Sequence, residues 1–306
     1  MHSNVNPTAE HISVCICTYK RPELLKTLLE KLRSQNTDGL FTYSIVVADN
    51  DSLQSAKAVV SEFASASSIP ITYCVESQQN IALTRNRAIE NATGEYIAFI
   101  DDDEFPAPNW LLALYTTCSK NRVDGVLGPV LPYFENKPPS WVIKGKFFDR
   151  RTHETGFKID WTEGRTGNLL FRRQILEGGE RPFRAEYGSG GEDRDFFTRM
   201  MARGRVFIWC HEAVAYELVP PIRWKRSFML RRALLRGKVD LVDPASRLRN
   251  LARSAIALPA YTLALPFLLL LGHHRFMKFL VKTCDHLGRI LTFLGVDPVK
   301  QKYVTE

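Results

Sequence analysis

The sequence predicts an α/β protein in which a mostly parallel sheet is flanked by helices, followed by a helical C-terminal region. Strand and helix patterns alternate through residues 12–100, and the basic residues are concentrated near the end of the chain. Of the 306 residues, 45% are hydrophobic and 24% are charged. This balance is typical of a packed globular enzyme and excludes a disordered, collagenous or disulfide-stapled chain.

The alternating part begins with Ile12–Tyr19, an apolar run that predicts a buried strand. Pro22–Leu32 follows as an amphipathic helix, with its proline in the first turn, where no backbone donor is needed. The same pattern then repeats along the chain. The next predicted elements are strand Tyr43–Asp49, helix Leu53–Ala66, strand Ile71–Val75, helix Ile81–Ala92 and strand Tyr96–Ile100. Strands that are connected through helices in this way form a parallel sheet.

The periodicity is weaker beyond Trp110, although four further elements can be predicted. Strands are predicted at Gly125–Val130 and Arg205–Cys210. A regular pattern is also found again at Thr166–Phe171. A helix is predicted to open at Gly191 and to run to Met200.

We expect two regions with different charge. Residues 1–218 form the α/β domain, with a first half at about 12–110 and a second half at about 111–218, and contain 25 basic and 28 acidic residues. Residues 219–306 form a basic, hydrophobic helical region with 16 basic and 5 acidic residues. The positive balance of the chain therefore belongs to its C-terminal region.

The six cysteines show no CxxC pair and no spacing with histidine that is typical of zinc. We expect reduced and mostly buried thiols. The segment Met1–His11 is polar and lacks the apolar run of a signal peptide, so we expect the chain to remain in the cytosol.

Polar clusters follow three of the predicted strands, where ligands of parallel sheets bind. These clusters are Thr18-Tyr19, Asp49-Asn50-Asp51 and Asp101-Asp102-Asp103. Three consecutive aspartates concentrate negative charge that a divalent cation would relieve. In an extended segment Asp101 and Asp103 point the same way and can address one metal, whereas Asp102 turns aside. A solvated acidic turn is the alternative interpretation.

Two further segments carry charged side chains that could bind phosphate or accept a proton. Arg85 lies near the start of a predicted helix, where backbone N–H groups and a guanidinium can meet phosphate oxygens. Glu192 and Asp193 lie at the start of a later helix, whose dipole keeps carboxylates ionised and able to accept a proton. A solvated helix face and ordinary acidic capping are the alternatives.

Together these segments resemble the family 2 glycosyltransferases, inverting enzymes of the GT-A fold that use nucleotide sugars. The resemblance covers roughly Ile12 to Gly237, and its signatures occur in the order of the family. They are Val14–Glu23, Ile45–Ser52, Asn80–Asn86, Phe99–Asp103 and Gly190–Phe196. Val46–Asp51, Val126–Val130 and Gly190–Phe197 look most like the glucosyltransferases of succinoglycan-type bacterial exopolysaccharide assembly.

The resemblance implies roles for the nucleotide-sugar half, residues 12–110. Thr18, Tyr19 and Asp49 would hold the uracil and ribose, and Arg85 would lie near the base or the diphosphate. Asp101 and Asp102 would also contact the nucleotide sugar.

For the metal and the chemistry, the resemblance implies four acidic residues. Asp101 and Asp103 match the DxD motif, with Asp103 as the direct ligand of Mn²⁺ or Mg²⁺, which would neutralise the departing UDP. Asp193 matches the catalytic base, and Glu192 would bond acceptor hydroxyls in the acceptor half, residues 111–218. One base and one displacement imply inversion at the anomeric carbon.

The sequence departs from the family near Val214–Glu217, where many relatives carry a histidine that can serve as an extra metal or phosphate ligand. Tyr216 cannot readily replace such a histidine. His211 lies nearby, but a lone histidine at the end of a strand is usually structural, and we expect no site role for it.

The C-terminal region contains 19 residues without a charge, Ser254–Gly272, which reach the length needed to span a bilayer. Pro259 and Pro266 disfavour a simple span. In His273–Lys282 cations alternate with apolar residues at helical spacing, as in a helix on anionic lipid. We expect attachment to the cytoplasmic face of the bacterial inner membrane, peripheral or monotopic. A helical pair packed on the catalytic domain is the alternative.

The predicted function is transfer of a hexose, with glucose expected, from a UDP-sugar to a lipid-linked saccharide. The partners are this donor, this acceptor and an anionic membrane surface, without nucleic acid, and the sequence does not define an oligomeric state. One rival is a catalytically silent membrane-bound glycan-binding subunit. A sugar-nucleotide pyrophosphorylase is disfavoured because Thr18–Pro22 contains no glycine for a phosphate loop.

Overall fold

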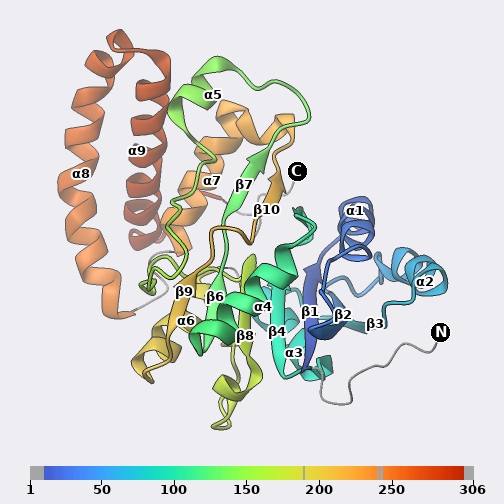
Figure 1. Ribbon diagram of the computed structural model, residues 1–306. Coiled ribbons are helices and arrows are strands. Elements are labelled where there is room, and N and C mark those ends of the chain that lie inside the picture. Colours follow the sequence, from blue (N-terminus) through green and yellow to red (C-terminus); the bar gives the residue numbers. More distant parts are fainter. Residues whose placement is uncertain (1–9, 189, 240, 242–243, 300–306) are drawn as a thin grey trace, which may run out of the picture. The chain divides into compact units, whose positions relative to one another are not determined.

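The computed structural model describes residues 10–188, 190–239, 241 and 244–299 (Figure 1). The chain forms two compact units, Met1–Pro132 with Arg150–Leu218 and Tyr133–Asp149 with Val219–Glu306. Residues 133–149, which the sequence analysis placed in the acceptor half, thus group with the C-terminal region. The reason is aromatic packing, because the Trp141 ring lies 5.4 Å from the His273 ring and 5.9 Å from the Arg226 guanidinium.

The first unit is built on a seven-stranded sheet of order β3-β2-β1-β4-β8-β6-β9. Only β8 runs antiparallel to its neighbours among these described strands. The strands are β1 (Glu10–Thr18), β2 (Phe41–Asp49), β3 (Ile71–Val75), β4 (Tyr96–Ile100), β6 (Gly125–Leu127), β8 (Asn168–Arg172) and β9 (Phe207–Trp209). The predicted α/β class with a mostly parallel sheet is confirmed.

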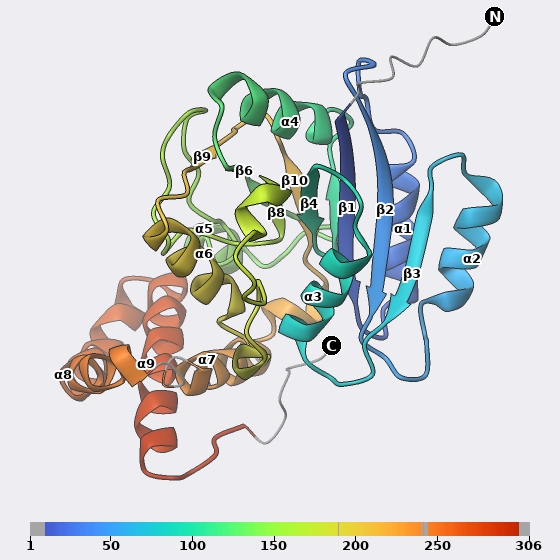
Figure 2. The same cartoon turned by 90° about the horizontal axis from the view of Figure 1, so that it is seen from below.

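Helices cover both faces of this sheet because successive strand residues point to opposite sides (Figure 2). Val14 and Val47 belong to a core shared with α1, α2 and α4, whereas Cys15 and Val46 belong to a core shared with α3 and α6. These helices are α1 (Pro22–Leu32), α2 (Lys57–Ala66), α3 (Ile81–Asn91), α4 (Trp110–Asn121) and α6 (Glu192–Ala202). The cysteines are all free, as predicted, and three of them are buried.

Several predicted elements differ from the observed ones in their bounds, and for two of them the reason is visible in the structure. Helix α2 starts at Lys57 instead of Leu53, because the preceding loop folds back so that the Ala56 amide donates to the Asp49 carboxylate. The predicted strand Gly125–Val130 is interrupted at residues 128–129. Gly128 packs so closely on Ala213 that a Cβ there would collide with the Ala213 carbonyl oxygen.

A second, three-stranded sheet has the order β5-β10-β7. Its strands are β5 (Glu104–Pro106), β7 (Val130–Tyr133) and β10 (Ala215–Leu218), and β5 and β10 are antiparallel. Strand β5 directly follows the three aspartates, so this sheet fixes one side of the acidic segment. Short helices α5 (Ser140–Gly145), η1 (Arg173–Leu176), η2 (Ala185–Tyr187) and η3 (Pro221–Trp224) complete the connections.

The second unit contains three long helices, α7 (Arg226–Val239), α8 (Pro244–Leu270) and α9 (His273–Phe293). Helix α9 packs against both α7 and α8 (Figure 1). Gly237 of α7 and Gly288 of α9 let two of these backbones approach, because a Cβ at either position would collide with a carbonyl oxygen of the facing helix. Helix α8 is one continuous helix despite Pro259 and Pro266.

Candidate active site

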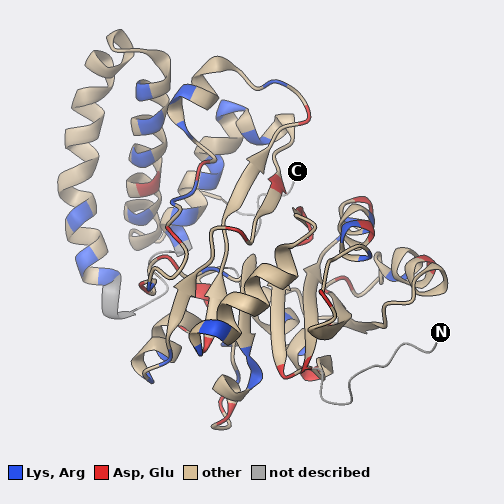
Figure 3. Cartoon of the chain, in the orientation of Figure 1, with Lys and Arg blue, Asp and Glu red and all other residues tan. Residues whose placement is uncertain are grey.

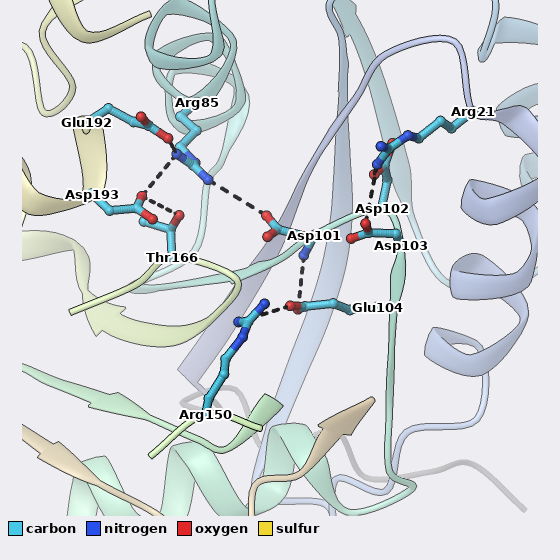
Figure 4. Close-up of polar contacts among 10 residues, drawn as sticks. All are labelled: Arg21, Arg85, Asp101, Asp102, Asp103, Glu104, Arg150, Thr166, Glu192 and Asp193. Carbon is cyan, nitrogen blue, oxygen red and sulfur yellow. Dashed lines mark hydrogen bonds and ion pairs between the residues drawn. The ribbon is translucent and has the colours of Figure 1, made fainter. Parts of the chain in front are cut away.

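The carboxyl ends of β1 and β4, the start of β8 and the first turns of α3 and α6 bring together a cluster of acidic and basic side chains (Figure 4). The pairing of β8 with β4 explains in part why these side chains lie together. Because β8 runs antiparallel to β4, with Ile100 opposite Asn168, the residues that precede β8 lie beside those that follow β4.

Arg85 lies at the centre of this cluster and connects three carboxylates. Its Nη1 atom pairs with Asp193 at 3.0 Å and with Glu192 at shorter range, and its Nη2 atom lies 3.7 Å from Asp101. The side chain is only 6% exposed, and its guanidinium lies over the Phe183 ring. Burial opposes the charge, but the surrounding carboxylates more than compensate and raise the pKa of Arg85. In this structure Arg85 therefore orients acidic side chains, and its predicted contact with the base or diphosphate stays a prediction.

The helix that carries Arg85 is itself anchored at its start. Asn80 caps α3 by accepting a hydrogen bond from the Leu83 amide at 3.1 Å, and its own amide donates to Asn50 at 2.9 Å. Asn80 also donates to the Ala185 carbonyl, and Asn86 exchanges two hydrogen bonds with the Phe183 backbone. These bonds fix the segment that leads to α6.

Asp193 is placed as a partly exposed acceptor at the start of α6. Its Oδ1 atom accepts a 2.7 Å hydrogen bond from Thr166 and pairs with Arg85. The side chain is 29% exposed, whereas that of Glu192 is 8% exposed. Burial raises the pKa of Glu192 although Arg85 opposes the shift. Of the two carboxylates, Asp193 is the one that a substrate can reach more easily, with Oδ2 turned to neither Thr166 nor Arg85.

The three aspartates differ in exposure and partners. Asp102 accepts hydrogen bonds from Thr18 Oγ1 at 2.8 Å and from Arg21 Nη1 at 3.1 Å, and the same Arg21 nitrogen lies 3.4 Å from Asp103. Asp101 is more exposed, at 45% of its side chain. Removal from water raises the pKa of Asp101 to about 7 and that of Asp102 to about 6, while Arg85 and Arg21 respectively oppose these shifts.

Asp101 and Asp103 offer oxygen ligands of the kind that Mn²⁺ and Mg²⁺ prefer. Among the residues that the structure describes, no group of three His, Cys, Asp or Glu side chains forms a complete metal cage. The donor set therefore fits a cation that takes its remaining ligands from substrate phosphates and water, which is usual for Mg²⁺ sites.

A fourth carboxyl, Glu104, completes the acidic cluster. Its side chain is buried, its Oε1 atom makes no hydrogen bond, and Arg150 lies 4.0 Å away while also pairing with Glu217. Burial, reinforced by the negative charges of Asp101 and Asp103, raises the pKa of Glu104 well above its usual range. Gly167 makes room for this cluster, because a Cβ there would lie 2.8 Å from Glu104 Oε1 and 2.9 Å from Asp101 Oδ2.

The residues predicted for the nucleotide lie near the ends of β1 and β2. The Asp49 carboxylate is fully buried and accepts hydrogen bonds from the amides of Asp51 and Ala56 and from the Tyr73 hydroxyl. In this structure Asp49 holds its loop, and the predicted uracil or ribose contact stays a prediction. Tyr19 is partly buried, with the Lys20 ammonium 5.2 Å from its ring centre.

At the position where relatives carry histidine, Tyr216 stacks on Phe105 with ring centres 5.5 Å apart. His211 is an exposed residue whose backbone amide donates to Thr155. The expectation that His211 has no site role stays a prediction.

Four residues of the cluster were not predicted from the sequence: Arg21, Glu104, Arg150 and Thr166. Arg21 and Glu104 flank predicted motifs, so their proximity was a usable signal. Thr166 and Arg150 carry no local signal, because their contacts depend on long-range pairing.

Comparison with known proteins gives a consistent result. Residues 13–179 match the family model described as glycosyl transferase family 2. The chain is 32% identical over 95% of its length to the succinoglycan biosynthesis protein ExoM of Rhizobium meliloti, of which the match covers 95%. It is 28% identical over 70% of its length to the glycosyltransferase AglE of Haloferax volcanii, covering 69% of that protein.

Solved structures show the same fold. The mannosyltransferase PcManGT of Pyrobaculum calidifontis, in complex with GDP-Man and Mn²⁺, aligns with a TM-score of 0.60 at 19% identity, covering 94% of this chain and 88% of that one. TarS 1–349 of S. aureus in complex with UDP-GlcNAc aligns with a TM-score of 0.54 at 15% identity, covering 97% and 98%.

Proposed function

Because the chain belongs to glycosyl transferase family 2, we propose that it transfers a hexose, glucose in the first instance, from a UDP-sugar to a lipid-linked glycan with inversion. The observation that carries this proposal is the position of Asp193, which Thr166 and Arg85 hold while Arg85 also contacts Asp101. A proton acceptor is thereby tied to the acidic segment that matches the DxD motif. The similarity to a succinoglycan biosynthesis protein supports a role in bacterial exopolysaccharide synthesis.

Asp193 acts as the general base in this proposal. Its Oδ1 atom is engaged by Thr166 and Arg85, so Oδ2 accepts the proton of the acceptor hydroxyl as that oxygen attacks the anomeric carbon. Glu192 lies beside it for a hydrogen bond to another acceptor hydroxyl. A single base and a single displacement lead to inversion.

Asp101 and Asp103 are the residues that would hold Mn²⁺ or Mg²⁺. When bound, the cation supplies positive charge that neutralises the departing UDP. Arg21 and Thr18 hold Asp102 and so fix the neighbouring carboxylates, while Arg85 keeps Asp101 oriented. Thr18, Tyr19 and Asp49 remain the proposed contacts for uracil and ribose.

The second unit supports a site of action at the cytoplasmic membrane face. Helix α8 contains one stretch, Arg247–Leu270, that is long and apolar enough to cross a membrane, and only 6% of it is buried. A lipid-linked acceptor would be presented at the same surface.

The test is hydrolysis or transfer of UDP-glucose by the full chain with Mn²⁺, followed by NMR of the anomeric configuration of the product. We expect turnover that EDTA abolishes and that Asp103→Ala reduces at least 100-fold together with metal-dependent UDP binding. UDP-galactose and UDP-GlcNAc serve as competing donors. Full activity in EDTA would contradict the metal assignment, and absence of turnover with every UDP-sugar would favour a silent glycan-binding subunit.

A further inference from the structure

The outer face of α8 is apolar and uncovered over much of its length. Residues 254–272 contain no charged side chain. At 1.5 Å per residue the helical part of this stretch, residues 254–270, forms a surface roughly 25 Å long. Its most exposed large side chains are Ile256 (75%), Leu263 (74%), Phe267 (70%) and Leu270 (86%). An apolar surface of this extent requires an apolar partner.

Helix α9 runs back along α8 directly after the turn at Gly272. The Tyr261 ring of α8 lies 5.3 Å from the Phe279 ring and 5.6 Å from the His286 ring of α9. The Lys282 ammonium lies 6.0 Å from the same Tyr261 ring. A lysine of α9 is therefore level with the middle of the charge-free stretch of α8.

Cations form a row along α9. Arg275, Lys278 and Lys282 are spaced three and four residues apart, so they share one face of the helix, and all three are exposed. Within the part of the chain that the structure describes, no carboxylate lies within ion-pair distance of them. Figure 3 shows basic residues along α9, whereas those of α8 lie only in the part before Ser254.

This arrangement conflicts with a helix that crosses the bilayer. If α8 crossed along the membrane normal, α9 would enter beside it and carry Lys282 to the middle of the hydrocarbon core, where charged side chains are rare and costly. A helix parallel to the surface avoids this cost, since cations beside inserted apolar residues reach the level of the headgroup phosphates.

We infer that α8 lies in the plane of an anionic membrane surface, with its outer face inserted below the headgroups and the cation row of α9 against lipid phosphates. The inference rests on the membrane attachment proposed above and adds its geometry. The charges favour anionic lipid over a second copy of the chain as the partner. Two copies of a region with 16 basic and 5 acidic residues would repel each other.

Depth measurements on the full-length protein test this geometry. A fluorescent amino acid is introduced at position 256, 263 or 270, and its quenching by nitroxides placed shallow or deep in vesicles of phosphatidylcholine and phosphatidylglycerol is compared. We expect all three positions to be quenched best by the shallow nitroxide. Deep quenching at 263 with shallow quenching at 256 and 270 would show a span and overturn the inference, while membrane attachment would stand.

Matched substitutions test the surface itself. Leu263→Glu with Phe267→Glu is expected to weaken vesicle binding at least tenfold, whereas Leu53→Glu, at a position 82% exposed in the first unit, leaves binding unchanged. Circular dichroism and UDP-sugar hydrolysis check that each variant is folded. Failure of the native protein to bind vesicles, or a dimer that buries α8 in solution, would overturn the inference, and persistent UDP-sugar hydrolysis would leave the proposed reaction intact.

Discussion

The acidic cluster of the first unit and the cation row of the second unit use charge in opposite ways. Around Arg85, which is itself buried, each charged side chain faces a partner inside the same unit. Along α9, Arg275 and Lys278 face outward without a carboxylate partner in the described residues. Charges that are paired internally can fix geometry, whereas exposed charges without a carboxylate partner stay available to a partner outside the protein. The comparison predicts that mutations in the first unit change turnover and those in the second change location.

The largest expected effect is at Asp193. Asp193→Asn keeps size and hydrogen bonding but removes the base, so turnover should fall by roughly 10²-fold or more. UDP-sugar affinity, measured by calorimetry, should barely change. Glu186→Gln, an exposed carboxyl change just before α6, is the control. Near-native turnover of the Asp193 variant would reduce this residue to a helix cap.

Arg85→Lys should have the next largest effect, because an ammonium cannot connect three carboxylates. Lysine keeps the charge but loses the fork geometry, so part of the pairing is lost and both thermal stability and turnover should fall. Arg87→Lys, on the exposed side of the same helix, is the matched control. The ratio of kcat loss to UDP affinity loss is decisive: a change confined to UDP affinity would mean that Arg85 binds diphosphate and does not position Asp193.

Thr166→Val removes one hydrogen bond to Asp193. A hydrogen bond to a charged group contributes about 1.5 kcal/mol, which corresponds to about a tenfold loss of turnover. Thr166→Ser should restore most of the activity because the hydroxyl is retained. If serine fails to rescue the loss while the variant remains folded, packing and not the hydrogen bond explains the role of Thr166.

The smallest effect is expected in the cation row. Lys278→Gln should weaken binding to anionic vesicles by about 1 kcal/mol, roughly fivefold, at low salt and have no effect on UDP-sugar hydrolysis in solution. The difference should shrink as salt is added, because exposed charges are screened. Lys120→Gln in the first unit is the control. If Lys278→Gln and Lys120→Gln weakened vesicle binding equally, binding would depend on the total charge of the protein and not on the cation row of α9.

The sequence predicted the parallel core and most acidic residues because both depend on local patterns. An apolar run followed by a polar cluster singled out Asp101, whereas Asp193 was singled out by its position at the start of a helix and by the resemblance to family 2. The role of Arg85 could not be predicted, since its ion pairs with Glu192 connect residues that are 107 positions apart. The split at Gly128 likewise depends on the distant Ala213.

The crossing of α7 and α9 has a mechanical consequence. Gly237 and Gly288 bring the two backbones together, and Arg236 pairs with Asp285 beside them at 3.0 Å. Because neither glycine has a side chain, the two backbones are in direct contact here. Sliding or rotation of α9 on α7 would therefore bring backbone atoms into collision. At the proposed membrane surface, a lateral force on α9 would therefore be transmitted to α7 through this backbone contact.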